Sequence, residues 1–134
     1  GVYDNNLRRA IASDAHVTFT VAVQTLNIGY LDEIYDYVES VGINPANVGW
    51  STTVTYPARH NASTIPSELK QQYKDKYAKR QFKQIESLEQ AISILDTQHD
   101  SDNEFQEFIR QQKFFDNIRN ECLTTVFPEF SKTM

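Results

Sequence analysis

The sequence predicts an α/β fold with one βαβ unit and a small parallel sheet, followed by a mainly helical carboxyl-terminal half. Two β-rich runs, at residues 17–23 and 48–56, lie on either side of an amphipathic segment at 30–41. Parallel strands need a crossover of about a dozen residues or more, usually a helix, and this spacing provides one. Nothing else reads clearly as a strand, and a two-stranded sheet is marginal in water. We therefore expect the sheet to be completed by strands from elsewhere.

The amino-terminal part predicts a short helix within residues 1–15, with Leu7 and Ile11 on one side. The first strand follows at 17–23. Polar and apolar residues alternate poorly along it, because its threonines are β-branched and only mildly polar. Both faces of this strand are therefore expected to be buried, as in a parallel sheet.

The segment at 30–41 predicts a helix, because its apolar residues recur at helical spacing. They are Leu31, Ile34, Tyr35, Val38 and Val41. Its acidic residues lie mainly on the opposite side, and Gly42 is a stop signal for the helix. The second strand at 48–56 comes after a turn, and Pro57 ends it.

The region 65–130 predicts helices, with Ser67 or Thr64 as a cap and a polar break at 97–103. Cys122 falls on the apolar stripe of the last predicted helix, so its thiol is expected in the core and not as a nucleophile. The closing segment at 127–130 is expected to close the fold or dock on it. We expect a single domain, 1–134, with the βαβ unit at 16–57.

Six basic residues lie close together before a mainly acidic stretch. They are Lys70, Lys74, Lys76, Lys79, Arg80 and Lys83. One interpretation is a helix that contacts phosphate groups. The other is a solvated helix face opposite the acidic residues of 86–107 across a hairpin. We prefer the second, because surface helices commonly carry such charges.

Composition limits the classes of function. The formal net charge of −5 weighs against a general nucleic-acid binder. A single cysteine excludes an intrachain disulfide and a cysteine-based zinc or cluster site, and it fits a reducing, cytoplasmic setting. No apolar run approaches the roughly twenty residues of a membrane span. The glycine-rich phosphate-binding motifs are absent, and the three histidines (at 16, 60 and 99) are far apart, so no metal site is expected.

The candidate binding residues follow the two strands, because parallel sheets bind ligands at the carboxyl ends of their strands. They are Gln24 and Asn27 after the first strand, and Tyr56, Arg59 and His60 after the second. Arg59 and His60 can donate hydrogen bonds or hold an anion. The alternative is that they are ordinary polar loop residues. No catalytic residue can be named.

Several segments resemble the twitch-domain branch of the radical S-adenosylmethionine enzymes. Residues 17–27 (VTFTVAVQTLN) and 30–34 (YLDEI) resemble a late strand–helix unit of the barrel. Residues 54–57 (VTYP) and 65–70 (IPSELK) are similar to the last barrel strand and the segment after it. The carboxyl end of that branch is similar to 115–120 (FDNIRN) and 126–130 (VFPEF). The resemblance implies cosubstrate or substrate contacts near Gln24, Asn27 and Tyr56.

The chain departs from that family at its cluster motif. Those enzymes hold a four-iron four-sulfur cluster with C-x-x-x-C-x-x-C, and this chain has only Cys122. No cluster ligand therefore transfers to this chain. The resemblance implies a carboxyl-terminal fragment, or a relic without the catalytic half. S-adenosylmethionine and the cluster would then belong only to a longer parent, and we expect no cofactor in this chain.

The leading functional hypothesis is an incomplete radical S-adenosylmethionine-like protein that is not catalytic by itself. One alternative is a small oligomeric binding or scaffold protein of an uncharacterised family, including a viral one. Another is an enzyme whose site forms between subunits at Arg59 and His60. The expected partner is a second copy or a missing amino-terminal half; a membrane or a nucleic acid is not expected.

Overall fold

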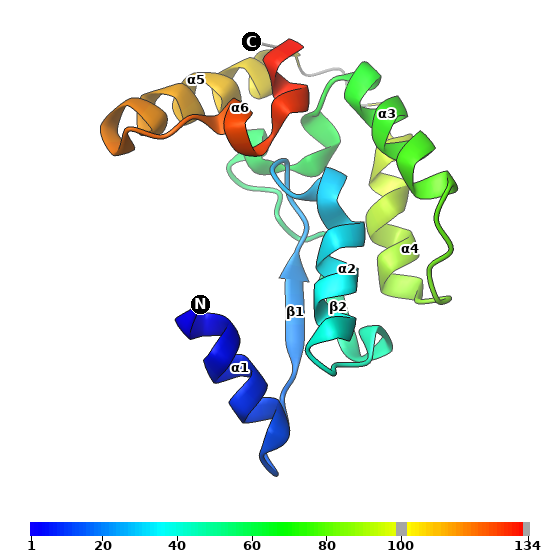
Figure 1. Cartoon of the computed structure of the whole chain (residues 1–134). Helices are drawn as coiled ribbons and strands as arrows, with labels where there is room; N and C mark the ends of the chain where they lie inside the picture. Colours follow the sequence, from blue (N-terminus) through cyan, green and yellow to red (C-terminus); the bar gives the residue numbers. More distant parts are fainter. Residues whose placement is uncertain (99–101, 133–134) are drawn as a thin grey trace.

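The computed structural model describes residues 1–98 and 102–132, which form a mainly helical molecule around a small parallel sheet (Figure 1). The α-helices are α1 (Val2–Ala12), α2 (Leu31–Ser40), α3 (Ser67–Ala78), α4 (Glu86–Ser93), α5 (Asp102–Arg119) and α6 (Leu123–Val126). The strands are β1 (Phe19–Ala22) and β2 (Val48–Ser51). Short 3-10 helices connect these elements at Ile28–Tyr30, Pro45–Asn47, Ala58–His60, Ala62–Thr64, Ile94–Asp96 and Pro128–Lys132.

The two strands pair in parallel, with Phe19 opposite Val48. Both are shorter than predicted, because the ladder ends where the amide of Val23 donates to the carbonyl of Ser51 at 2.8 Å. Beyond this bond the chains diverge, and residues 52–56 have no ladder partner in the described part of the chain.

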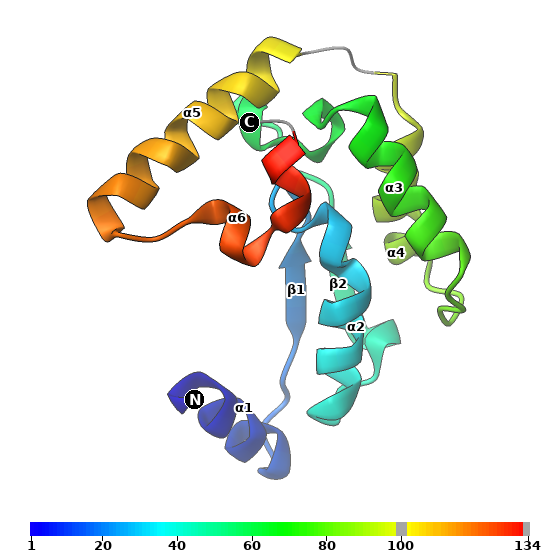
Figure 2. The same ribbon diagram turned by 45° about the horizontal axis from the view of Figure 1, so that its top comes forward.

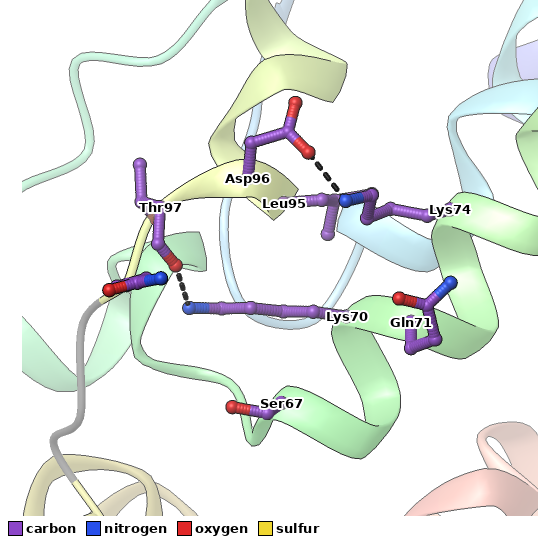
Figure 3. A pocket seen from close by; sticks show the side chains of 8 residues that line it. Ser67, Lys70, Gln71, Lys74, Leu95, Asp96 and Thr97 are labelled. Atoms are coloured by element: carbon purple, nitrogen blue, oxygen red, sulfur yellow. Dashed lines mark hydrogen bonds and ion pairs between the residues drawn. The ribbon is translucent and has the colours of Figure 1, made fainter.

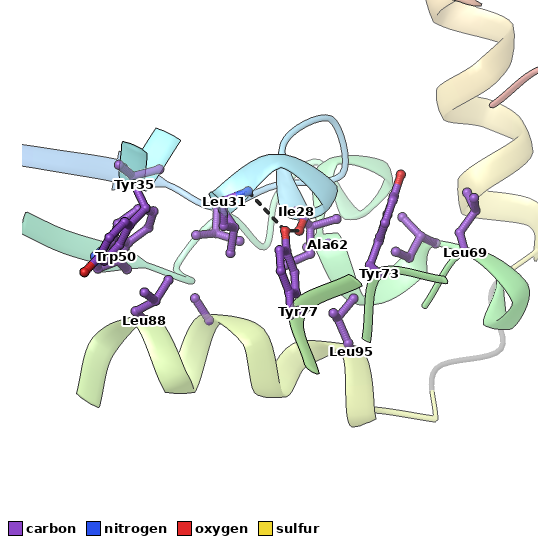
Figure 4. Close-up of a cluster of buried hydrophobic side chains, with 14 of the residues drawn as sticks. Ile28, Leu31, Tyr35, Trp50, Ala62, Leu69, Tyr73, Tyr77, Leu88 and Leu95 are labelled. Atoms are coloured by element: carbon purple, nitrogen blue, oxygen red, sulfur yellow. Dashed lines mark hydrogen bonds between the residues drawn. The ribbon is translucent and has the colours of Figure 1, made fainter. Parts of the chain in front are cut away.

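Among the described residues, side chains cover one face of the sheet and leave the other exposed. Val21, Val48 and Trp50 point into the core and are buried, whereas Thr20, Ala22 and Gly49 are exposed. The expectation that both faces of the first strand are buried is therefore wrong for this chain alone. Helices α2 and α4 supply the cover, and the ring of Trp50 lies close to Tyr35 and Leu88 (Figure 4).

Helix α3 completes the core by packing against the start of α2. The ring of Tyr73 lies over Gly29, and a Cβ added at Gly29 would lie 2.9 Å from Cδ1 and closer to two other ring carbons. The hydroxyl of Tyr77 accepts a hydrogen bond from the amide of Leu31 at 3.0 Å and donates one to the carbonyl of Ile28. Two tyrosines therefore join α3 to the start of α2 (Figure 4).

The basic run faces α2 more than the acidic stretch that follows it. Helix α3 ends at Ala78, so the run continues into a non-helical segment. The ion pairs of this run are Lys76–Asp32 at 2.9 Å, Lys83–Glu39 at 3.2 Å, Arg80–Asp36 and Lys74–Asp96 at 2.6 Å. The predicted hairpin partner is thus right for Asp96, and the other three carboxylates belong to α2.

The carboxyl-terminal region differs from prediction at two points. Helix α5 begins at Asp102, so the polar break is shorter than expected; residues 99–101 lie outside the described part. Cys122 is exposed, and the prediction of a core thiol is wrong. Helix α5 ends at Arg119, and Asn120 turns the chain with a φ of 53°, which takes Cys122 off the helix.

The closing segment docks on α5, as predicted. Phe130 is fully buried, with ring contacts to Phe105 and Phe108. The second half of α5 extends away from the rest of the molecule, and α6 lies beneath it (Figure 2). None of the described helices has the length and apolar character needed to cross a membrane.

Candidate functional site

The loops that follow the two strands meet at the carboxyl edge of the sheet. The amide of Thr25 donates to the carbonyl of His60 at 3.0 Å. The hydroxyl of Thr25 donates to the carbonyls of Arg59 and Asn61 at 3.0 and 3.1 Å. Thr25 is 1 % exposed. These three bonds hold the loop after β1 against the Ala58–His60 turn. The loop carries the candidate residues Gln24 and Asn27, and the turn carries Arg59 and His60.

Asn27 is used by the turn itself. Its Oδ1 accepts a hydrogen bond from the amide of Gln24 at 2.8 Å, and its Nδ2 donates to the carbonyl of Ala22 at 2.9 Å. The side chain therefore replaces ladder bonds at the end of β1. Asn27 therefore shapes the loop, and both the oxygen and the nitrogen of its side-chain amide already form hydrogen bonds.

Arg59 and His60 both contact α5. Nε of Arg59 donates to Oε1 of Gln111 at 2.8 Å, and the ring of His60 meets Phe108 edge-on at 5.8 Å. Burial, followed by the charge of Arg59, lowers the pKa of His60, so its imidazole is neutral at neutral pH. Tyr56 differs from Arg59 and His60 in its burial, because 90 % of its surface is exposed to solvent.

A groove opens beside these loops, between the second half of α5 and α6. Its volume is about 760 Å³. Its apolar lining consists of Leu26, Phe115, Leu123, Val126 and Phe127. Leu26 belongs to the same loop as Gln24 and Asn27, so the groove lies at the ligand-binding edge of a parallel sheet.

Charged groups of both signs border this groove. Oδ2 of Asp116 accepts a hydrogen bond from the amide of Leu123 at 2.7 Å, and the guanidinium of Arg119 lies 5.4 Å from the centre of the Phe115 ring. Hydrogen bonds from neighbouring threonines, Thr124 first, lower the pKa of the Cys122 thiol. The groove can therefore hold an apolar group next to a polar or charged one. The groove was not predicted from the sequence, because Leu26, between the candidate residues Gln24 and Asn27, was the only local signal for it.

A second cavity of about 450 Å³ lies between the start of α3 and the Ile94–Asp96 turn (Figure 3). Nζ of Lys70 donates to the carbonyl of Thr97 at 2.8 Å, and Lys74 pairs with Asp96. These protein partners compete with any phosphate for the two ammonium groups. The geometry therefore favours the structural interpretation of the basic run.

Glu129 forms a polar cluster with Tyr30 and Tyr73 that the local sequence does not predict. Its two carboxylate oxygens accept hydrogen bonds from the hydroxyls of Tyr30 and Tyr73, each at 2.9 Å. Burial, followed by the hydrogen bond to Glu129, raises the pKa of both tyrosines, so they remain protonated donors. The cluster ties the closing segment to α3 and to the start of α2.

In the described part of the chain, no group of three or more His, Cys, Asp or Glu side chains could hold a metal ion. Comparisons with protein families, curated proteins and solved structures find no match to this chain. Function is therefore inferred from the residues and their geometry.

Proposed function

We propose that this chain supplies the carboxyl-terminal strands of a parallel α/β sheet in a radical S-adenosylmethionine-type protein. In this proposal, catalysis depends on an amino-terminal half that carries the cluster cysteines and the remaining strands. The observation that supports it is a parallel strand pair with one uncovered face. Each strand has a single neighbour among the described residues.

The uncovered face is unusual for this type of sheet. Parallel sheets are normally buried on both faces, and two strands alone are marginally stable. Here Thr20 and Ala22 of β1 face outward next to Gly49 of β2, and all three are exposed. Further strands and their crossover helices would cover this face and satisfy the outer edge of β1.

The distribution of exposed apolar residues favours the β1 side as the place of attachment. Helix α1 and the second half of α5 both extend to that side, whereas α3 and α4 lie on the β2 side (Figures 1 and 2). The exposed large apolar residues of the described chain are Val2, Tyr3, Tyr56, Phe114, Phe115, Ile118 and Val126. Six of these seven belong to α1, α5 or α6.

The same proposal places substrate contacts at the groove between α5 and α6. The resemblance implies contacts near Gln24 and Asn27, and the hydrogen bonds of Asn27 within its own turn leave Leu26 as the loop residue that reaches the groove. We therefore assign Leu26 and Phe115 to the substrate side of the assembled protein.

Anaerobic reconstitution tests the proposal. The chain would be produced alone and joined to the protein segment encoded upstream of it, with iron, sulfide, S-adenosylmethionine and a chemical one-electron reductant as the probes. The joined protein is expected to bind an iron–sulfur cluster and, with electrons from the reductant, to cleave S-adenosylmethionine to methionine and 5′-deoxyadenosine. The chain alone is expected to do neither.

Alanine replacements of the upstream cysteines provide the matched control, because they remove the cluster and leave this chain intact. An upstream segment without C-x-x-x-C-x-x-C, or a joined protein that folds and binds no cluster, would contradict the proposal.

A further inference from the structure

The closing segment at 127–130 is held to the rest of the molecule by its side chains. The amides of Phe127 and Phe130 donate to the carbonyls of Leu123 and Phe127, within the same stretch of chain. In the described part of the chain, no backbone-to-backbone hydrogen bond joins residues 123–132 to the sheet or to another helix. A segment without such bonds can open at a lower free energy than the elements around it.

Two aromatic side chains of the segment lie on aromatic side chains of the surrounding elements. Phe130 is fully buried, with its ring centre 5.9 Å from that of Phe105 and 6.3 Å from that of Phe108. The ring of Phe127 meets the ring of Tyr30 edge-on at 5.1 Å. Tyr30 belongs to the turn that follows the loop after β1, so the segment covers aromatic groups close to the ligand-binding edge of a parallel sheet.

The carboxylate of Glu129 is held by two neutral donors. Each of its oxygens accepts one hydrogen bond of 2.9 Å, from the hydroxyl of Tyr30 or from that of Tyr73. Among the residues that the structure describes, Glu129 forms no ion pair. Hydrogen bonds to an ionised acceptor are stronger than neutral ones, and a side-chain amide would offer only one oxygen to the two hydroxyls. The pair of hydroxyls therefore selects a carboxylate.

We propose that the closing segment is a releasable strap, and that the surface under it binds a peptide segment of another protein that carries a carboxylate between two aromatic side chains. In this structure the chain's own Phe127, Glu129 and Phe130 occupy that surface. A tethered segment competes at an effective concentration of about millimolar, so an outside peptide binds well only when the strap is open. This regulation goes beyond the proposed function, because it uses neither the edge of β1 nor the upstream segment.

Hydrogen exchange of the unchanged chain, followed by mass spectrometry, tests the release. The amides of 123–130 are expected to exchange at least about tenfold faster than those of α3, and a low concentration of urea is expected to accelerate them less, as for a local opening. Equal protection of the segment and α3, with the same dependence on urea, would show that they open only together and would overturn the proposal.

Binding of a free peptide tests the surface under the strap. The probe is the peptide VFPEFSK, the sequence of 126–132, and saturation-transfer NMR measures its affinity. The double variant Glu129→Gln, Phe130→Ala weakens the strap. It is expected to bind the probe at least about tenfold more tightly than the unchanged chain does, and about tenfold more tightly than it binds the same peptide with Gln in place of Glu. Ser131→Ala, at an exposed position beside the segment, is the matched control and is expected to bind as weakly as the unchanged chain.

Circular dichroism checks the helices of each variant. A double variant that loses its helices would show that the segment is a part of the core that the fold requires. Equal affinity for the Glu and Gln peptides would show that the two hydroxyls do not select a carboxylate. Either result, or a folded double variant that binds no peptide, would overturn the proposal.

Discussion

At the scale of single residues, Gly29 shows how a close approach dictates the amino acid. The ring of Tyr73 packs directly over its Cα, in a contact that no side chain could share. The same close approach of α3 lets the hydroxyl of Tyr77 form hydrogen bonds with the backbone of Ile28 and Leu31. The glycine thus permits α3 to reach the start of α2, and the reason is steric, since its φ lies outside the left-handed region.

Gly29→Ala is expected to lower the free energy of unfolding by about 1–3 kcal/mol, the usual cost of overpacking a core. The ring of Tyr73 would have to move, and with it the hydroxyl that bonds Glu129. Gly49→Ala is the control, because its nearest contact would be Oγ1 of Thr20 at 3.4 Å on the exposed face. Urea denaturation of both variants measures the difference, and equal losses would contradict this account.

At the scale of elements, α2 is joined to α3 by a buried hydroxyl and to the basic run by a row of ion pairs. Helix α2 has no side-chain hydrogen bond at its own N-cap. The hydroxyl of Tyr77 meets the amide of Leu31, so α3 supplies the cap from a distant part of the chain. The Arg80–Asp36 and Lys83–Glu39 pairs are solvent-exposed, and such pairs contribute little each, whereas Lys76 pairs with the buried carboxylate of Asp32.

Tyr77→Phe is expected to destabilise the protein by about 1–3 kcal/mol, because it removes the hydroxyl that bonds the buried amide of Leu31 and the carbonyl of Ile28. Thermal unfolding followed by circular dichroism measures this loss. Tyr3→Phe removes the same hydroxyl from a side chain that is 67 % exposed, and it is expected to change nothing. If the two variants melt alike, the hydroxyl of Tyr77 is not a cap.

At the scale of the whole molecule, the parallel sheet lies at the boundary between a covered and an uncovered side. Helices α2, α3 and α4 share one core with the buried face of the strands, whereas α1 buries no residue completely. Tyr37 and Asp4 link α1 to α2 by a hydrogen bond of 2.9 Å. This unequal cover is what the proposed attachment of further strands would correct.

Thr20→Arg is expected to leave the stability of this chain alone within about 0.5 kcal/mol, as for most exposed positions. In the joined protein, the same change is expected to prevent close packing on the outer face of β1 and to abolish S-adenosylmethionine cleavage. Gln72→Arg, on the exposed side of α3, is the control with the same added charge. Full cleavage by the Thr20→Arg protein would show that this face stays open.

The sequence alone determined the local elements and the parallel relation of the strands, because helical spacing, β-branched runs and stop residues are local properties. It also predicted the docking of the closing segment, through its two phenylalanines. Tertiary structure decided which side of the sheet is covered, which carboxylates meet the basic run, and that Arg59 and His60 contact α5. These depend on contacts between residues distant in sequence, such as Thr25 with Arg59 or Glu129 with Tyr30, which no local pattern encodes.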